Sequence, residues 1–133
     1  MERVYTTPRL DKLGIKPGMR VALVDLDDKA FEAELRDRTH DVTRGEPLAE
    51  TNIVVFAADS HEALGRLAAL RERIVPNGAI WVVSRKGRAA AIRDTDVMAA
   101  AKAADLVDNK VASFDETRTS LRLVIPVALR PGR

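Results

Sequence analysis

Three short apolar runs constrain the fold of this chain of 133 residues more than any other feature. They are centred on residues 20–25, 52–58 and 79–83, and apolar side chains follow one another there without alternation. Runs of this length and pattern are typical of strands that are buried on both faces of a parallel sheet. Because parallel strands need a crossover connection, usually a helix, the runs predict an α/β fold.

Helical patterns lie between and after these runs. A helix over residues 29–38 would place Phe31 and Leu35 on one face, with Asp28 as its N-cap. A further helix is predicted over residues 95–104, capped by Asp94 or Thr95. Both segments are therefore expected to cover a face of the sheet.

The most regular apolar period follows the second run. Leu67, Leu70 and Ile74 continue a spacing of three and four residues that begins at Ala63. Asp59 and Glu62 have the spacing of a capping box. The pattern predicts one long helix that begins after Asp59 and is stopped by residues 76–78, Pro-Asn-Gly.

The C-terminal part of the chain reads as two strands, residues 106–114 and 120–127. A short connection of this kind joins antiparallel strands. Residues 41–43 fit one more short strand. We therefore predict a single compact Rossmann-like domain over residues 1–133: a three-layer α/β sandwich with a mainly parallel sheet and a C-terminal antiparallel hairpin. Residues 1–11 read as a polar lead-in.

Composition excludes several classes of function. The chain has no cysteine, which excludes a disulfide framework, a thiolate zinc site and a cysteine nucleophile. Its 22 basic and 20 acidic residues nearly balance, so the charge is not that of a nucleic-acid-binding protein. No apolar run approaches the roughly 20 residues that cross a bilayer, and the N-terminus has no signal region. We expect a cytoplasmic protein that binds neither nucleic acid nor membrane.

Parts of the chain resemble the second half of a class I methyltransferase. Residues 52–59 form an apolar strand that ends in an acid, and residues 75–83 form a Pro-Gly loop followed by the next strand. Residues 104–107 are similar to the small-residue turn before the sixth strand of that fold, and residues 106–125 to its closing antiparallel hairpin. The resemblance implies a truncated methyltransferase-like Rossmann domain.

A closer resemblance covers most of the chain. Residues 13–21, 81–86 and 106–115, together with residues 120–123, are similar to a bacterial domain-of-unknown-function family, number 3052. Thr119 stands where that family is expected to carry Trp. The family has no established activity, so this resemblance implies the fold and no particular chemistry.

The loop after the first apolar run bears on any cofactor. A cofactor that lies close to the backbone needs glycine there, because a side chain would stand in the way. Residues 25–31 contain no glycine, and Asp25, Asp27 and Asp28 would repel the carboxylate of S-adenosylmethionine. We therefore expect no cofactor, and a degenerate S-adenosylmethionine-dependent methyltransferase is the alternative.

The same loop allows a second alternative. An Asp-x-Asp pair after a hydrophobic strand is the spacing of Mg²⁺-dependent phosphatases of the haloacid dehalogenase type, in which the first Asp attacks phosphorus. Here Asp28 and Lys29 replace the small residues that usually follow. In the simpler interpretation Asp25 ends the strand and Asp27 or Asp28 caps the next helix, whose dipole favours an anion.

The candidate ligand-binding residues lie where predicted strands end. Ligands of open α/β sheets bind at the carboxyl ends of the strands, near a topological switch point. The loop of residues 84–88, Ser-Arg-Lys-Gly-Arg, is the best candidate for contact with an anion, since it holds three cations and a glycine. It has no aromatic side chain to stack on a single-stranded nucleic acid. We expect a crevice lined by Asp25, Asp27, Asp59, Ser60, Ser84, Arg85 and Lys86.

These observations predict a non-catalytic domain that binds a small anionic ligand or a protein partner, which includes a second copy of the chain. His40 and His61 have no matching acid motif, and no metal site is expected. A seven-stranded doubly wound sheet with its helices would need about 168 residues. The chain is therefore short by one or two strand–helix units, which we place between the first apolar run and Asn52.

Overall fold

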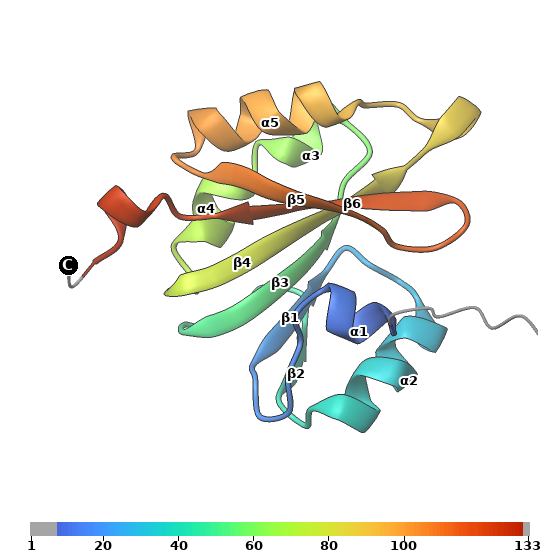
Figure 1. The fold of residues 1–133 in the computed structure, drawn as a ribbon, viewed down its shortest axis with the longest axis vertical. Coiled ribbons are helices and arrows are strands. Elements are labelled where there is room, and N and C mark those ends of the chain that lie inside the picture. The colour runs from blue at the N-terminus through green and yellow to red at the C-terminus, as the bar shows by residue number, and fades with distance from the viewer. Residues whose placement is uncertain (1–7, 132–133) are drawn as a thin grey trace, which may run out of the picture.

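A six-stranded sheet forms the centre of the molecule in the computed structural model, which describes residues 8–131 (Figure 1). The strand order is β2-β1-β3-β4-β6-β5. Strands β1 to β4 are parallel, and β6 is antiparallel to both β4 and β5. The mainly parallel sheet with a C-terminal antiparallel hairpin is confirmed. The strands are β1 (Val21–Val24), β2 (Val42–Arg44), β3 (Thr51–Ala57), β4 (Ile74–Arg85), β5 (Val107–Ser113) and β6 (Arg118–Val124).

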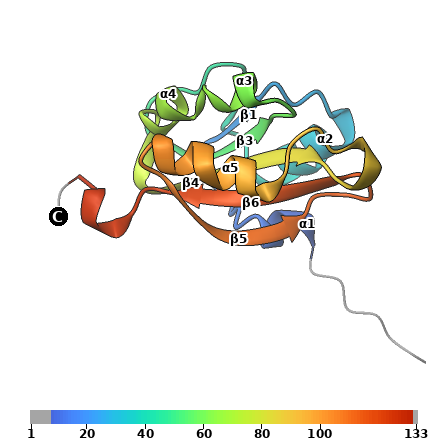
Figure 2. The ribbon, with the colours of Figure 1, turned by 90° about the horizontal axis from the view of Figure 1, so that it is seen from above.

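Helices cover both faces of this sheet (Figure 1). On one face lie α1 (Arg9–Lys12) and α2 (Lys29–Arg38). On the other lie α3 (His61–Leu64), α4 (Leu67–Arg71) and α5 (Asp94–Ala103). The short 3₁₀ turns η1 (Gly87–Ala89) and η2 (Val127–Leu129) follow β4 and β6. Figure 2 shows β5 at one edge of the sheet with α1 beside it.

Alternation along β4 divides the core into two layers. Ile80 and Val82 pack with α3, α4 and α5, while Trp81 and Val83 pack with α1 and α2. Trp81 is fully buried, and its Nε1 donates a hydrogen bond of 2.9 Å to the carbonyl oxygen of Leu13. This satisfies its one polar side-chain atom, so Trp81 is a core residue.

The prediction for α2 is confirmed in both its bounds and its cap. The backbone N–H of Phe31 donates to Oδ1 of Asp28 at 2.9 Å, and Phe31 and Leu35 are fully buried. The last α-helix, α5, begins at Asp94, so the cap predicted at Asp94 or Thr95 is wrong and Arg93 stands at the cap position. Its first turn is closed by Asp96, whose carboxylate accepts from the backbone N–H of Arg93 at 2.8 Å.

The single long helix predicted after Asp59 is wrong. Two short helices, α3 and α4, take its place, with a break at Gly65 and Arg66, and the second ends at Arg71. Residues 76–78 do not stop a helix, because they lie inside β4. The start of β3 competes for this segment: Thr51 donates to the carbonyl of Arg73 and pairs with Ile74.

The N-terminal lead-in needs a smaller correction. Residues 9–12 form α1, and Leu10 is 3% exposed within the core, so this part is not merely a polar tail. Residues 1–7 lie outside the described residues. The short strand predicted at 41–43 is present as β2. Between β1 and β3 the chain forms only α2 and β2, in the segment where we expected the shortening.

Candidate functional site

The candidate residues lie at the carboxyl ends of the parallel strands. Asp25 follows β1, Asp59 follows β3 and Arg85 ends β4, and these three strands are parallel. From β1 the chain continues to β2 on one side and then to β3 on the other, so the topological switch point lies between β1 and β3. Ligands of open α/β sheets bind at such a place.

An arginine that the sequence did not single out occupies this switch point. Arg66, at the break between α3 and α4, pairs through Nη1 with the carboxylate of Asp25 and through Nη2 with that of Glu46. Asp25 has a positive φ of 56°, which Asp tolerates better than most residues. Asp27 is 87% exposed, and its Oδ1 lies 4.0 Å from Nη2 of Arg44. The pairing with Arg66 favours a structural role for Asp25 over that of a nucleophile.

Ser60 takes the capping role that was predicted for Asp59. The side chain of Ser60, not of Asp59, caps α3, since its Oγ accepts from the backbone N–H of Ala63 at 3.0 Å. Asp59 instead accepts from the backbone N–H of Arg85 at 2.8 Å. The capping-box interpretation is wrong because strand pairing continues through Ala58, whose N–H donates to the carbonyl of Val83.

The basic loop after β4 is fixed by its backbone. The N–H of Lys86 donates to the carbonyl of Thr117 at 3.0 Å, and Gly87 adopts a positive φ of 70° at the start of η1. Ser84 is buried, at 5% exposure. The side chains of Arg85 and Arg88 are exposed and make no hydrogen bond or ion pair with residues 8–131. The loop therefore presents cations from a defined backbone.

Lys86 is held by a neutral partner. Its Nζ donates to Oγ of Ser113 at 3.1 Å, and that hydroxyl donates in turn to the carbonyl of Asp115 at 3.2 Å. An ammonium has three donors, so hydrogen bonds remain for a further acceptor. Because the partner carries no charge, the positive charge of Lys86 is not cancelled.

Arg118, opposite this loop, is paired with two carboxylates. Its Nε donates to Asp115 at 2.9 Å, and its Nη2 pairs with both Asp115 and Asp28. Burial is the largest influence on the pKa of Asp28 and raises it. The hydrogen bonds from Phe31 and Arg118, with the charges of Arg118 and Arg9, outweigh burial and lower the pKa of Asp28 below its ordinary value.

The pKa of Asp115 behaves in the same way. Burial again acts first and raises it, but hydrogen bonds from Arg118 and Thr117 and the charge of Arg118 lower the pKa of Asp115 overall. Both carboxylates therefore stay ionised beside Arg118 at neutral pH. The β5–β6 turn is thereby tied to the start of α2.

Stacking on aromatic rings strengthens this connection. The guanidinium carbon of Arg9 lies 4.8 Å from the ring centre of Phe31 and 4.7 Å from that of Phe114. The guanidinium carbon of Arg118 also lies 4.8 Å from the ring centre of Phe114. Arg9 also pairs with Glu34 at 3.0 Å. These arginines are structural side chains whose charges are already used.

Two hollows separate the predicted site residues into groups. The first, which we call the loop hollow, measures about 380 Å³ and is lined by Arg85, Lys86, Ala89, Glu116, Thr117 and Arg118. The second, of about 460 Å³, is lined by residues of the β1 and β2 ends that include Asp25 and Asp27. Asp59, Ser60 and Ser84 line neither of these two hollows.

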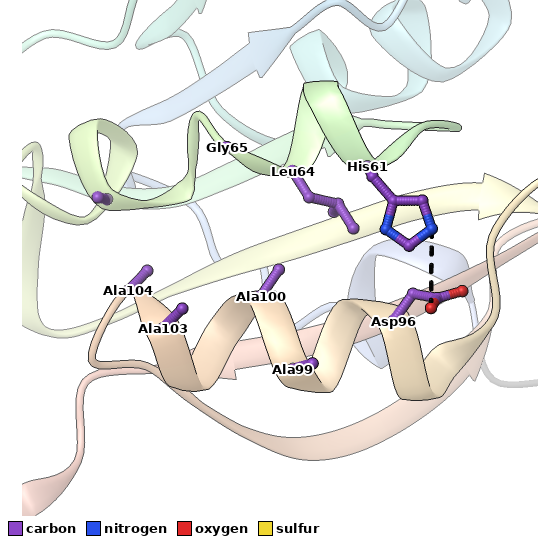
Figure 3. A pocket seen from close by; sticks show the side chains of 9 residues that line it. His61, Leu64, Gly65, Asp96, Ala99, Ala100, Ala103 and Ala104 are labelled. Atoms are coloured by element: carbon purple, nitrogen blue, oxygen red, sulfur yellow. Dashed lines mark ion pairs between the residues drawn. The ribbon is translucent and has the colours of Figure 1, made fainter.

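A third hollow lies between the helices of the other face (Figure 3). It measures about 390 Å³, and Leu64 faces the alanine side chains of α5 across it. At one end Nε2 of His61 lies 3.8 Å from Oδ1 of Asp96. His61 therefore does have an acidic neighbour, contrary to our expectation, because the first residue of α3 lies beside the first turn of α5.

The part of the chain that the structure describes, residues 8–131, contains no group of three His, Cys, Asp or Glu side chains placed to hold a metal ion. In the same residues, no helix has the length and apolar character needed to cross a membrane.

Residues 10–127 match the model of a family described as "Protein of unknown function (DUF3052)". The chain belongs to the DUF3052 family. The match covers both the loop after β1 and the basic loop after β4. No curated protein shows significant sequence similarity to this DUF3052 chain.

Solved structures show that the DUF3052 fold is methyltransferase-like. The pyocyanin biosynthetic protein PhzM has a TM-score of 0.62 and 13% identity, covering 89% of this chain and 53% of PhzM. A putative methyltransferase from Thermoplasma acidophilum has a TM-score of 0.63 and 9% identity, covering 96% of this chain and 76% of the other. The chain thus spans about half the length of PhzM.

A third example is closer in size. A TehB-like SAM-dependent methyltransferase from Corynebacterium glutamicum has a TM-score of 0.58 and 10% identity, covering 89% of this chain and 86% of that one. Identities of this size show the shared fold alone. The resemblance to class I methyltransferases stated from the sequence is confirmed at the level of the fold.

Proposed function

We propose that this DUF3052 protein is a non-catalytic domain that binds a small anion, a phosphate or carboxylate group, in the loop hollow. The observation that carries the proposal is the basic loop after β4. Arg85, Lys86 and Arg88 have no carboxylate partner within residues 8–131, although most arginines around them are paired. Unneutralised cations beside a hollow favour an anionic occupant.

The pairing of charges around the loop hollow supports this. Arg118 is held between Asp28 and Asp115, and Glu116 makes no ion pair within residues 8–131. The charges of these groups with Arg85 and Lys86 balance, but the cations of the loop make no ion pair within the same residues, so they can meet an anion. The backbone hydrogen bonds of Arg85 to Asp59 and of Lys86 to Thr117 order the loop in advance, and a preordered loop loses less entropy when a ligand binds.

Calorimetry with sodium pyrophosphate at low ionic strength tests the proposal. We expect saturable binding that weakens by roughly ten- to a hundredfold in Lys86→Ala, since one charge-assisted hydrogen bond contributes about 1.5–3 kcal/mol. Lys102→Ala, an exposed lysine on α5, is the matched control and keeps the wild-type affinity. Absence of saturable heat, or equal weakening in both variants, would contradict the proposal.

An acidic surface on a partner protein presents the same carboxylate chemistry as a small ligand. A partner that binds through the basic loop would lose affinity in Lys86→Ala and compete with pyrophosphate. Light scattering on the purified chain separates this from self-association, for which mass rises with concentration. A mass that stays that of one chain excludes a second copy as the partner.

The second candidate function is S-adenosylmethionine binding by a degenerate methyltransferase, which the fold favours. The contacts of the loop after β1 oppose it: Asp25 is paired with Arg66 and Asp28 with Arg118. Calorimetry with S-adenosylmethionine and S-adenosylhomocysteine is expected to give no saturable heat. Binding at micromolar concentration would establish the second candidate in place of the first.

A further inference from the structure

A fourth hollow adjoins the loop hollow and has a different character. We call it the α1 hollow: it measures about 640 Å³ and lies between α1, the end of α2 and the end of β5. Lys86 and Glu116 line both hollows, so the two adjoin at these side chains. A volume of about 300–1,000 Å³ is that of pockets for small organic molecules.

Most charges on the α1 hollow are cancelled within the chain. Arg9 pairs with Glu34 at 3.0 Å, Arg38 with Asp11 at 2.9 Å, and Asp115 with Arg118. A bound anion would gain little binding free energy from these side chains, because carboxylates of the chain already pair with them. The α1 hollow is therefore a poor site for an inorganic ion by itself.

Apolar groups complete its lining. The accessible lining is more apolar than polar, and Pro8 is its exposed apolar residue. Leu10 and Phe114 lie behind it, each 3% exposed, with Arg9 and Arg118 against the ring of Phe114. A fixed, mainly apolar lining suits a planar or aliphatic body. Lys12, on the same wall, makes no side-chain ion pair or hydrogen bond within the described residues, so it can meet a polar substituent on that body.

Lys86 stands at the junction of the two hollows. Ser113 holds its Nζ at 3.1 Å, and Ser113 itself lines the α1 hollow. An anion on Lys86 would thus have the loop hollow on one side and the apolar wall on the other. The arrangement suits one molecule with two unlike parts.

We propose that the ligand is an organic phosphate or carboxylate with an apolar body. Its anionic group binds Lys86 and Arg85 in the loop hollow, and its body lies in the α1 hollow against the exposed ring of Pro8. This inference rests on the proposed function and goes further, because it names the class of molecule. Inorganic anions are then partial ligands only.

A pair of probes tests the inference: methyl phosphate and phenyl phosphate, titrated into the ¹⁵N-labelled full chain. We expect phenyl phosphate to bind roughly tenfold more tightly or better, from burial of its ring. Both probes should shift the amide signals of residues 85–90. Phenyl phosphate alone should also shift those of Lys12, Glu34 and Ser113.

A variant that fills the α1 hollow sharpens the test. Lys12→Trp is expected to remove the preference for phenyl phosphate and to leave methyl phosphate binding within about twofold, because the loop hollow is untouched. Lys16→Trp, at an exposed position outside the hollow, is the control and keeps the preference. Retention of the preference in Lys12→Trp would contradict the inference.

The remaining outcomes separate the two proposals. Equal affinity for the two probes, with shifts confined to residues 85–90, overturns the apolar body and leaves the anion site standing. No binding of either probe overturns both proposals. Phenyl phosphate shifts around His61 and α5, with none near Lys86, would place the ligand in the hollow of Figure 3 and also overturn both.

Discussion

Two arginines connect parts of this chain that are far apart in sequence. Arg66 reaches Asp25 across 41 positions, and Arg118 reaches Asp28 across 90 positions. Local patterns predicted the cap formed by Asp28, because a cap depends on neighbours three residues away. They could not predict its second partner, which depends on where β6 begins in space. The candidate acids were therefore found from the sequence, and the cations that hold them were not.

The substitution Arg118→Gln is expected to lower the free energy of unfolding by about 2 kcal/mol, the contribution of a hydrogen bond to charged groups. It leaves Asp28 and Asp115 close together without their shared cation. Urea denaturation measures the loss. Arg36→Gln, which removes an exposed pair with Glu32 on α2, is the control and should cost less than about 0.5 kcal/mol. Equal costs for the two variants would show that Arg118 is no more than a surface charge.

The substitution Arg118→Gln is also expected to change how the stability of the chain depends on pH. The pKa of Asp28 and that of Asp115 are lowered in the folded chain, so their stabilising effect is full above the ordinary value of about 3.9. It is lost as pH falls through the lowered folded-state pKa. In Arg118→Gln both values should rise, and stability should decrease less between neutral and acidic pH. The ¹³C shifts of the two carboxyl groups report the midpoints; unmoved midpoints would contradict this account.

At the scale of elements, strand pairing decided where the helical pattern fails. The period through Leu67 and Leu70 is real, and both residues are buried in α4. The continuation to Ile74 is not helical, because the start of β3 pairs with that residue. A periodic pattern contains no information about a competing partner strand. The three apolar runs, in contrast, needed no such information, since burial on both faces marks them as strands wherever their partners lie.

Gly78 shows how tight this pairing is. A Cβ on Gly78 would lie 2.7 Å from the carbonyl oxygen of Asn52 on β3, a distance that backbone atoms cannot accept without moving. Gly78→Ala is therefore expected to cost about 1–3 kcal/mol in urea denaturation, as overpacking does. Asn77→Ala, at the exposed neighbouring position, should stay within about 0.5 kcal/mol. A Gly78→Ala variant as stable as the wild type would mean that β3 and β4 are not in this register.

At the scale of the whole molecule, the chain combines a methyltransferase-like fold with an acidic loop after β1 and a basic loop after β4. The sandwich, the mainly parallel sheet and the edge at which Asp25, Asp59 and Arg85 meet follow from residue patterns and connection rules. The division of the strand ends into separate hollows could not be predicted from these patterns, because it depends on side chains such as Arg66. In our account the loop after β1 is tied down by ion pairs, and the basic loop after β4 is open to an anion.

One measurement tests this account most directly: ¹H–¹⁵N spectra of the full chain, titrated in parallel with pyrophosphate and with S-adenosylmethionine. We predict saturable shifts of the amides of residues 85–90 and Thr117 with pyrophosphate, and no saturable shift at residues 25–28 with S-adenosylmethionine. The opposite result, with saturable shifts at residues 25–28 and 58–60 from S-adenosylmethionine and none around Lys86 from pyrophosphate, would contradict it.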